Sequence, residues 1–260
     1  MRSDADSGAA DAADVAADAA GAFAVDTATV RAFLDDSHVE FASRAAEFAR
    51  RELAAEPGPP DDAGARVRAR EILAALGVGR WLDPIAAGDF RACCLLREAL
   101  AAASPLADAV FALQALGAVP IRLAGGEALA KAWLEPAIAG RAMGAFAMTE
   151  PEAGSDVAAI ATRAVRDGDA YVIDGRKTLI SNAGIADFYV VFASTDPEAG
   201  REGLSAFVIP GEASGLRFLG PQVMSAPHPL GEIAFEGCRV PAAYRLGEEG
   251  DGFRIGMATL

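Results

Sequence analysis

The spacing of apolar residues changes along the chain near Gly140. From Thr27 up to this point, apolar side chains recur every three or four positions, which is the period of an amphipathic helix. After it, apolar and polar positions alternate, as they do in a half-buried strand. The predicted helices cover residues 27–53 (with a break near Asp35), 63–76, 90–102 and 105–116, with a short one from Gly125 through Leu134.

The predicted strands cover residues 143–148, 161–165, 170–173, 177–180, 188–193, 204–209 and 232–235. Turn signals at Asp167-Gly168-Asp169 and Asp174-Gly175 favour hairpins between neighbouring strands. These strands predict a small antiparallel β domain, a barrel or a sandwich. Residues 250–260 return to a helical pattern, and we expect Phe253, Ile255 and Met257 there to lack partners.

The pattern therefore predicts an α+β multidomain fold. An Ala/Asp-rich tail over 1–24 is expected to be disordered, because it offers little apolar surface to offset the entropy of ordering. An all-helical domain follows over 25–140, then a middle β domain over 141–248, and residues 249–260 begin a further helix.

Composition narrows the classes of function. A formal net charge of −14 argues against nucleic acid or an anionic membrane as a partner. Cys93, Cys94 and Cys238 give no disulfide framework and no paired zinc spacing, and with two histidines no metal site is expected. The acidic N-terminus lacks the features of a signal peptide, and no apolar stretch long enough to span a membrane is free of charge. These features predict a soluble cytoplasmic protein.

The candidate chemistry is concentrated in residues 146–156, FAMTEPEAGSD. Phe146 and Met148 belong to the end of a strand, which Pro151 must terminate because it has no N–H to donate. Gly154 and Ser155 then form a tight polar turn, with N–H groups and a hydroxyl suited to a phosphate or a flavin edge. On these residues alone, an ordinary strand followed by a turn is the favoured interpretation.

As a string, FAMTEPEAGSD resembles the first flavin motif of the acyl-CoA dehydrogenase family. Four later segments also resemble that family in the same order and spacing: GRKTLISN at 175–182, LSAFVIP at 204–210, FEGCRVP at 235–241 and GEEGDGF at 247–253. The resemblance covers roughly Val25 to Leu260. The resemblance implies an N-terminal helical domain and a middle β domain, without the C-terminal four-helix domain.

The same resemblance implies an FAD site. Its members would be Phe146, Met148, Thr149, Gly154, Ser155, Leu179, Ile180 and Ser181. The hydroxyls of Thr149 and Ser181 would contact the polar edge of the ring, and backbone groups around Met148, Leu179 and Ile180 would complete the ring site. Ser155 would lie near the cofactor phosphate and the CoA of the substrate. Leu179 stands where the family commonly has Trp, and residues 224–231 lack the Gly and Arg that are usual there.

The activity implied is α,β-desaturation of an acyl thioester, in which a base removes the α-proton and a hydride passes to FAD. In the family that base is a Glu beyond the position of Leu260, so no catalytic residue is assigned here. The expected partners are an acyl thioester of CoA or of a carrier protein, a subunit supplying the C-terminal half or a homo- or hetero-oligomer, and an electron acceptor such as an electron-transfer flavoprotein.

Two alternatives remain open on the sequence. One is a related flavin enzyme of the same fold, either a flavin-dependent oxygenase or an acyl-carrier-protein dehydrogenase. The other is a degenerate, non-catalytic remnant that acts as a structural partner.

Overall fold

The computed structural model describes residues 25–54 and 58–260. The tail at 1–24, for which we expect disorder, lies outside the described residues. The chain forms two compact units: one takes in the residues up to Gly58 together with Asp89–Asp108, and the other Pro59–Gly88 and Ala109–Leu260. Each unit is described by itself.

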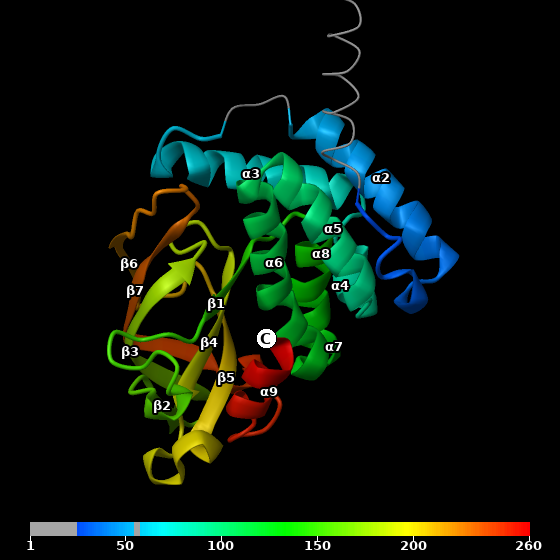
Figure 1. Ribbon diagram of the computed structural model, residues 1–260. Coiled ribbons are helices and arrows are strands. Elements are labelled where there is room, and N and C mark those ends of the chain that lie inside the picture. The colour runs from blue at the N-terminus through cyan, green and yellow to red at the C-terminus, as the bar shows by residue number, and fades with distance from the viewer. Residues whose placement is uncertain (1–24, 55–57) are drawn as a thin grey trace, which may run out of the picture. The chain divides into compact units, whose positions relative to one another are not determined.

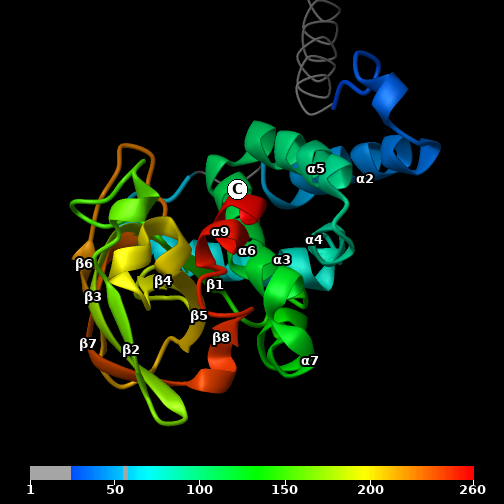
Figure 2. The same cartoon turned by 90° about the horizontal axis from the view of Figure 1, so that it is seen from below.

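The first unit is built on two helices, α2 (Asp36–Glu52) and α5 (Phe90–Ala103), which lie side by side in Figure 2. A short 3-10 turn, η1 (Arg31–Phe33), precedes α2. The imidazole of His38 is buried between the starts of the two helices: Nδ1 accepts from the backbone N–H of Asp35 at 3.1 Å and Nε2 lies 3.0 Å from Asp89 Oδ2. Asp35 caps α2 and Asp89 caps α5, so the His38 side chain links the N-terminal caps of the two helices.

The helices of the second unit are α3 (Asp62–Val78), α4 (Asp83–Ala87), most of α6 (Pro105–Ala124), α7 (Gly126–Leu129), the π-helical turn η2 (Ala130–Leu134) and α8 (Glu135–Ile138). Helix α6 is longer than predicted, since it continues through Pro120. Within the described residues, α6 is the one helix long and apolar enough to cross a membrane, but 56% of its apolar window is buried inside the structure, as in a core helix.

The strands of the same unit form one eight-stranded mixed sheet. They are β1 (Gly144–Ala147), β2 (Arg163–Asp167), β3 (Ala170–Ser181), β4 (Phe188–Ser194), β5 (Leu204–Pro210), β6 (Leu216–Pro221), β7 (Leu230–Pro241) and β8 (Arg245–Leu246). Their order is β6-β7-β3-β2-β4-β5-β8, with β1 beside β4. The α+β class with helices first is confirmed, but β1 and β2 each pair with β4 in parallel, so the sheet is not wholly antiparallel.

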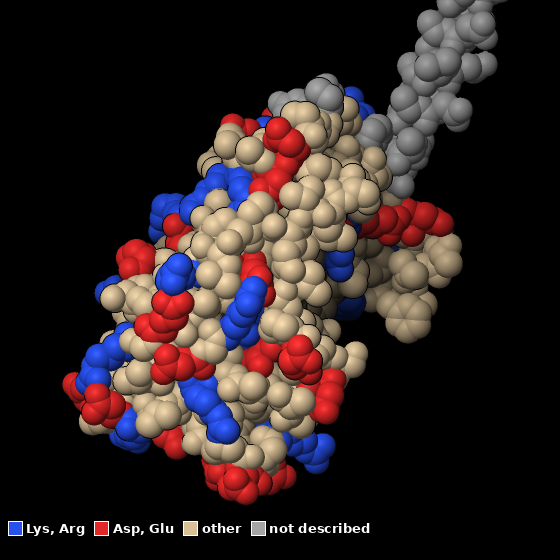
Figure 3. Space-filling model, turned by 90° about the vertical axis from the view of Figure 1, so that its left-hand side faces the viewer, with Lys and Arg blue, Asp and Glu red and all other residues tan. Residues whose placement is uncertain are grey.

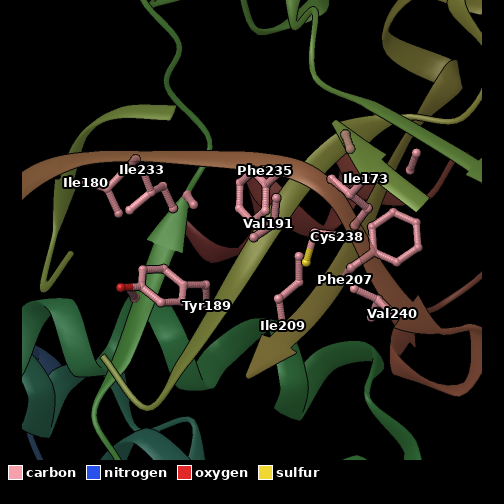
Figure 4. Close-up of a cluster of buried hydrophobic side chains, with 14 of the residues drawn as sticks. Ile173, Ile180, Tyr189, Val191, Phe207, Ile209, Ile233, Phe235, Cys238 and Val240 are labelled. Carbon is pink, nitrogen blue, oxygen red and sulfur yellow. The ribbon is translucent and has the colours of Figure 1, made fainter. Parts of the chain in front are cut away.

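Two apolar cores lie on the two faces of β4 and β5. The first, drawn in Figure 4, joins these strands to β3 and β7 through side chains such as Tyr189, Phe207, Ile233 and Phe235. The second lies on the opposite face, where Phe188, Val190 and Phe192 alternate with the residues of the first core. Side chains from α6, α7, α8 and α9 (Gly252–Thr259) complete it, and Figure 1 shows α6 and α9 beside these strands.

Several elements differ from the sequence prediction. The Asp174-Gly175 pair is no hairpin turn: β3 runs through it with a bulge, and a Cβ on Gly175 would lie 2.4 Å from Thr162 Oγ1. Strands β6 and β8 and the short helix α4 are present although their sequences showed no clear periodicity. Ile255 in α9 is 1% exposed, so the expectation that it lacks partners is wrong, whereas Met257 is 40% exposed.

Charges on the surface of the sheet are mixed in sign. Figure 3 shows cationic and anionic side chains next to one another on one face of the molecule. Ion pairs on these strands include Arg176–Glu232 at 2.6 Å and Arg217–Glu236 at 2.9 Å. Exposed pairs of this kind each contribute roughly 0–1 kcal/mol, so the fold depends on its two apolar cores far more than on them.

Candidate functional site

The loop that follows β1 and the last residues of β3 lie side by side. The backbone N–H of Thr178 donates to the carbonyl of Thr149 at 3.0 Å, which joins the two segments singled out by the sequence. Thr149 and Ser181 are half-buried on these segments, and Gly154 and Ser155 are exposed further along the loop. The fold therefore brings the two segments together, with Ser155 at the open end of the loop.

Three hydroxyl groups in this region have no protein partner. Over the ranges 25–54 and 58–260, no other protein group is hydrogen-bonded to the hydroxyls of Thr149, Ser155 or Ser181. A Cβ added to Gly154 would meet no atom within 4 Å, so the turn beside Ser155 is open. These groups are free to bind a polar ligand.

Three of the four apolar members of the predicted site belong to the cores. The ring of Phe146 packs against Phe192 with centroids 4.8 Å apart, Met148 is 6% exposed and Ile180 is 1% exposed. Met148 and Phe192 also lie against Gly256 of α9. Any contact of Met148 or Ile180 with a ligand would therefore come from the backbone.

Leu179 has an unusual conformation for its residue type. Its φ is +56°, in the left-handed region that β-carbon sterics disfavour, and its side chain is 56% exposed. The register of β3 against β7 shifts here, and the N–H of Leu179 donates instead to Gln222 Oε1 at 2.7 Å. Gln222 Nε2 donates in turn to Thr178 Oγ1 at 2.9 Å. The apolar side chain of Leu179 is thus presented to solvent two positions before Ser181 on the same strand.

A buried ion pair lies beneath the loop. Lys177 of β3 is 0% exposed, and its Nζ donates to Glu150 Oε1 at 2.8 Å and to the carbonyl of Met148 at 3.0 Å. The carboxylate of Glu150 also accepts the N–H groups of Ala161 at 2.7 Å and Thr162 at 3.0 Å. One carboxylate therefore ties together β3 and both ends of the loop.

The two members of this pair have shifted pKa values. Burial lowers the pKa of Lys177 to about 8, against the opposing attraction of Glu150. Burial acts to raise the pKa of Glu150, but the charge of Lys177 and the hydrogen bonds from Lys177, Thr162 and Ala161 together lower it. Glu150 is therefore an anion at neutral pH, and its carboxylate oxygens accept the hydrogen bonds that join β3 to the loop.

Asn182 fixes the end of β3. Its side-chain amide donates to the carbonyl of Gly144 at 2.8 Å and its backbone N–H to the carbonyl of Pro229 at 2.8 Å. Its φ of +63° lies in the left-handed region that Asn tolerates better than most residues. Asn182 thereby holds Ser181 against the start of β1, while Gln114 fixes that start by accepting the N–H of Gly144 at 3.0 Å.

Comparison with known proteins agrees with this arrangement. Residues 145–238, which contain both segments, match the family model described as acyl-CoA dehydrogenase, middle domain. The probable acyl-CoA dehydrogenase fadE25 of Mycobacterium leprae is 34% identical over 246 residues, or 87% of this chain. The butyryl-CoA dehydrogenase structure from Megasphaera elsdenii superposes with a TM-score of 0.77 at 31% identity over 87% of this chain.

The chain belongs to the acyl-CoA dehydrogenase family. It spans 60% of the length of the M. leprae protein and 62% of that of the M. elsdenii enzyme. Probable acyl-CoA dehydrogenase FadE25 of Mycobacterium tuberculosis is 38% identical over 175 residues, which are 66% of this chain and 45% of the relative. The match thus extends over the N-terminal and middle regions of these proteins.

Some of the residues that shape this site were not identified from the resemblance to the acyl-CoA dehydrogenase family. Lys177 and Glu150 lie within the motifs but were assigned no role from the sequence, and Gln222 was not singled out. Lys177 continues the alternating register of Tyr171 and Ile173, which was a usable signal, since a fully buried Lys needs a partner. Gln222 gave no such signal. Among the described residues, no three His, Cys, Asp or Glu side chains gather as a metal site requires.

Proposed function

We propose that the chain is the flavin-binding part of an acyl thioester dehydrogenase, with FAD held between the loop after β1 and the end of β3. The observation that supports this most directly is the set of hydroxyls of Thr149, Ser155 and Ser181, which have no partner within the described protein yet lie on two segments joined by the Thr178–Thr149 hydrogen bond. Family membership supports the same proposal.

The residues present fit the cofactor. Thr149 and Ser181 would donate to the polar edge of the ring, and Ser155 would lie at the phosphate and the substrate CoA beside the open turn at Gly154. The exposed side chain of Leu179 would lie against the ring, and Phe146, Met148 and Ile180 would support it from the core. Bound FAD would supply the acceptor for the hydride that leaves the acyl chain.

The base is not assigned to these residues. Glu150 is buried, ion-paired and stabilised as an anion by two backbone N–H groups, so it is poorly suited to take a proton from a substrate. Glu152 and Asp156 are exposed on the cofactor loop. We propose that the base comes from a further helical region, on this or another polypeptide, as does the cover of the acyl pocket.

The remaining parts of the proposal concern partners. The substrate would be an acyl thioester of CoA or of a carrier protein, and the electrons would pass to an acceptor such as an electron-transfer flavoprotein. We place the protein in the cytoplasm, where its free cysteines Cys93, Cys94 and Cys238 would remain reduced.

The test is FAD titration of the purified chain, followed by the visible flavin spectrum. We expect saturable binding, and we expect Thr149→Val and Ser181→Ala each to weaken it about two- to tenfold, because a neutral hydrogen bond contributes roughly 0.5–1.5 kcal/mol. The matched control is Thr195→Val, which removes a hydroxyl bonded to Ser205 in the β4–β5 connection. Unchanged binding in the Thr149→Val, Ser181→Ala double variant would remove both residues from the site.

A further inference from the structure

We propose that Lys177 is a positioning residue which, through Glu150, holds the loop from Met148 to Thr162 in the shape that binds the flavin. This inference rests on the proposed function. It assigns to a buried lysine, distant in sequence from the loop, control over residues that would touch the cofactor.

Lys177 and Thr178 hold three consecutive residues of the loop. Lys177 Nζ binds the carbonyl of Met148 and the carboxylate of Glu150, and the N–H of Thr178 binds the carbonyl of Thr149. Thr149 is therefore fixed on both sides and at its own carbonyl. Within the described residues, the hydroxyl of its side chain has no protein partner.

Glu150 extends this control to the rest of the loop. Its backbone N–H donates to the carbonyl of Ala153 at 2.9 Å, and the N–H of Ala153 donates back to Glu150 at 3.2 Å, which closes a tight turn. Its carboxylate holds Ala161 and Thr162, where the loop returns to the sheet. Ser155 lies between these two fixed points.

The ion pair between Lys177 and Glu150 orients the loop in a way that a contact between two apolar side chains at the same place would not. Two apolar side chains would fill the same space, and replacing a buried pair in that way is often neutral for stability. However, a contact between apolar side chains has no preferred direction, so it would not fix the orientation of the loop backbone. Three donors from two places in the sequence converge on the carboxylate of Glu150, so the loop backbone has one orientation that satisfies them all.

The experiment compares the wild-type chain with Lys177→Met in two measurements. FAD affinity is expected to fall by at least about tenfold, because hydrogen bonds to charged groups contribute more than neutral ones, and the visible band of the bound flavin is expected to shift. Amide hydrogen exchange in the free chain is expected to accelerate over residues 149–162, while the amides of β4 and β5 keep their protection.

The matched control is Ile173→Ala, a substitution on the same strand at another fully buried position. It removes packing from the first core and lowers the melting temperature, but FAD affinity should stay within about twofold of wild type, since no hydrogen bond to the loop is lost. If Lys177→Met does not fold, Glu150→Asp takes its place: it keeps the charge but is too short to reach Lys177 and both amides together.

The outcomes separate the two proposals. A wild-type chain that binds no FAD overturns the proposed function and, with it, the role given to Lys177. A wild-type chain that binds FAD while the Lys177 or Glu150 variant binds it equally well, with an unchanged spectrum, overturns this inference alone. Equal losses of affinity in the variant and in Ile173→Ala would also overturn it, because they would show a general loss of stability.

Discussion

The two halves of strand β3 differ in their pairing with neighbouring strands and in the groups that they expose. In the first half, Ala170 to Ile173 pairs with β2 on one side and β7 on the other in regular register, and Tyr171 and Ile173 are buried in the core. In the second half, Lys177 to Ser181 pairs with β7 alone, and with a shifted register. The first half stabilises the sheet, and the second exposes groups that a ligand can use.

The second half contains two features that cost stability by themselves. One is the fully buried ammonium group of Lys177, and the other is the left-handed backbone of Leu179. Such features persist where the surrounding structure determines them strongly, and they concentrate at functional sites. Under the proposed function, the second half of β3 is the part of the sheet where binding is favoured over stability.

The largest effect should come from breaking the buried pair. Lys177→Met leaves the carboxylate of Glu150 buried without its counterion, and such a loss costs about 3–5 kcal/mol of the free energy of unfolding. In the first half, Ile173→Val removes one methylene and should cost about 0.5–1.5 kcal/mol. Urea unfolding of both variants measures the contrast.

The double variant Lys177→Met, Glu150→Gln tests whether the uncompensated charge of Glu150 causes this loss of stability. It removes the uncompensated charge, so it should recover part of the stability that the single variant loses. A single variant no less stable than Ile173→Val would contradict the contrast between the two halves.

A second effect follows from the pKa of Lys177. The folded pKa is about 8 and the value for an unperturbed lysine 10.5, so between these pH values the unfolded chain holds a proton that the native chain has lost. This group's contribution to the free energy of unfolding therefore rises with pH across that window, by about 3 kcal/mol at roughly 1.4 kcal/mol per pKa unit.

The measurement is the difference in unfolding free energy between wild type and Lys177→Met from pH 7 to pH 11. Cys238, whose pKa burial raises to about 11, acts in the opposite direction as the pH rises, but it is present in both chains and cancels in the difference. A difference that stays constant with pH would show that Lys177 is not perturbed.

The contrast within β3 also shows what the sequence can and cannot predict. Alternation of apolar and polar residues predicted strands at 170–173 and 177–180, and the resemblance of the motifs to the acyl-CoA dehydrogenase family implied a flavin site at Thr149 and Ser181. The bulge at Gly175 was taken for a turn, since the sequence Asp-Gly suits both and only the packing of Gly175 against Thr162 decides between them.

Lys177 and Ile255 were missed for a common reason. Whether Lys177 is buried depends on Glu150, 27 positions away, and Ile255 is buried because α9 packs on β5. Both contacts are long-range, and hydrophobic periodicity reports only which face of an element is apolar, not what covers it. The apolar period of an α-helix likewise did not predict the π-helical turn at Ala130–Leu134.

The smallest predicted effect concerns Leu179. A residue with a Cβ pays about 1–2 kcal/mol to adopt this left-handed conformation, and glycine does not. The Leu side chain is 56% exposed, so its removal forfeits little burial. Part of the gain is offset by the greater flexibility of glycine in the unfolded chain. Leu179→Gly should therefore raise the free energy of unfolding by up to about 1 kcal/mol, although it makes the second half of β3 less able to contact a flavin ring.

Leu179→Ala is the control that separates the backbone from the side chain. It keeps the Cβ and its strain, so its stability should stay close to that of wild type, while its FAD affinity should fall as it does in Leu179→Gly, because both lose the apolar surface. Thermal unfolding and FAD titration of the three chains measure both quantities. If glycine gave no more stability than alanine, the left-handed backbone would impose no cost, and of the two destabilising features of the second half of β3 the buried charge alone would remain.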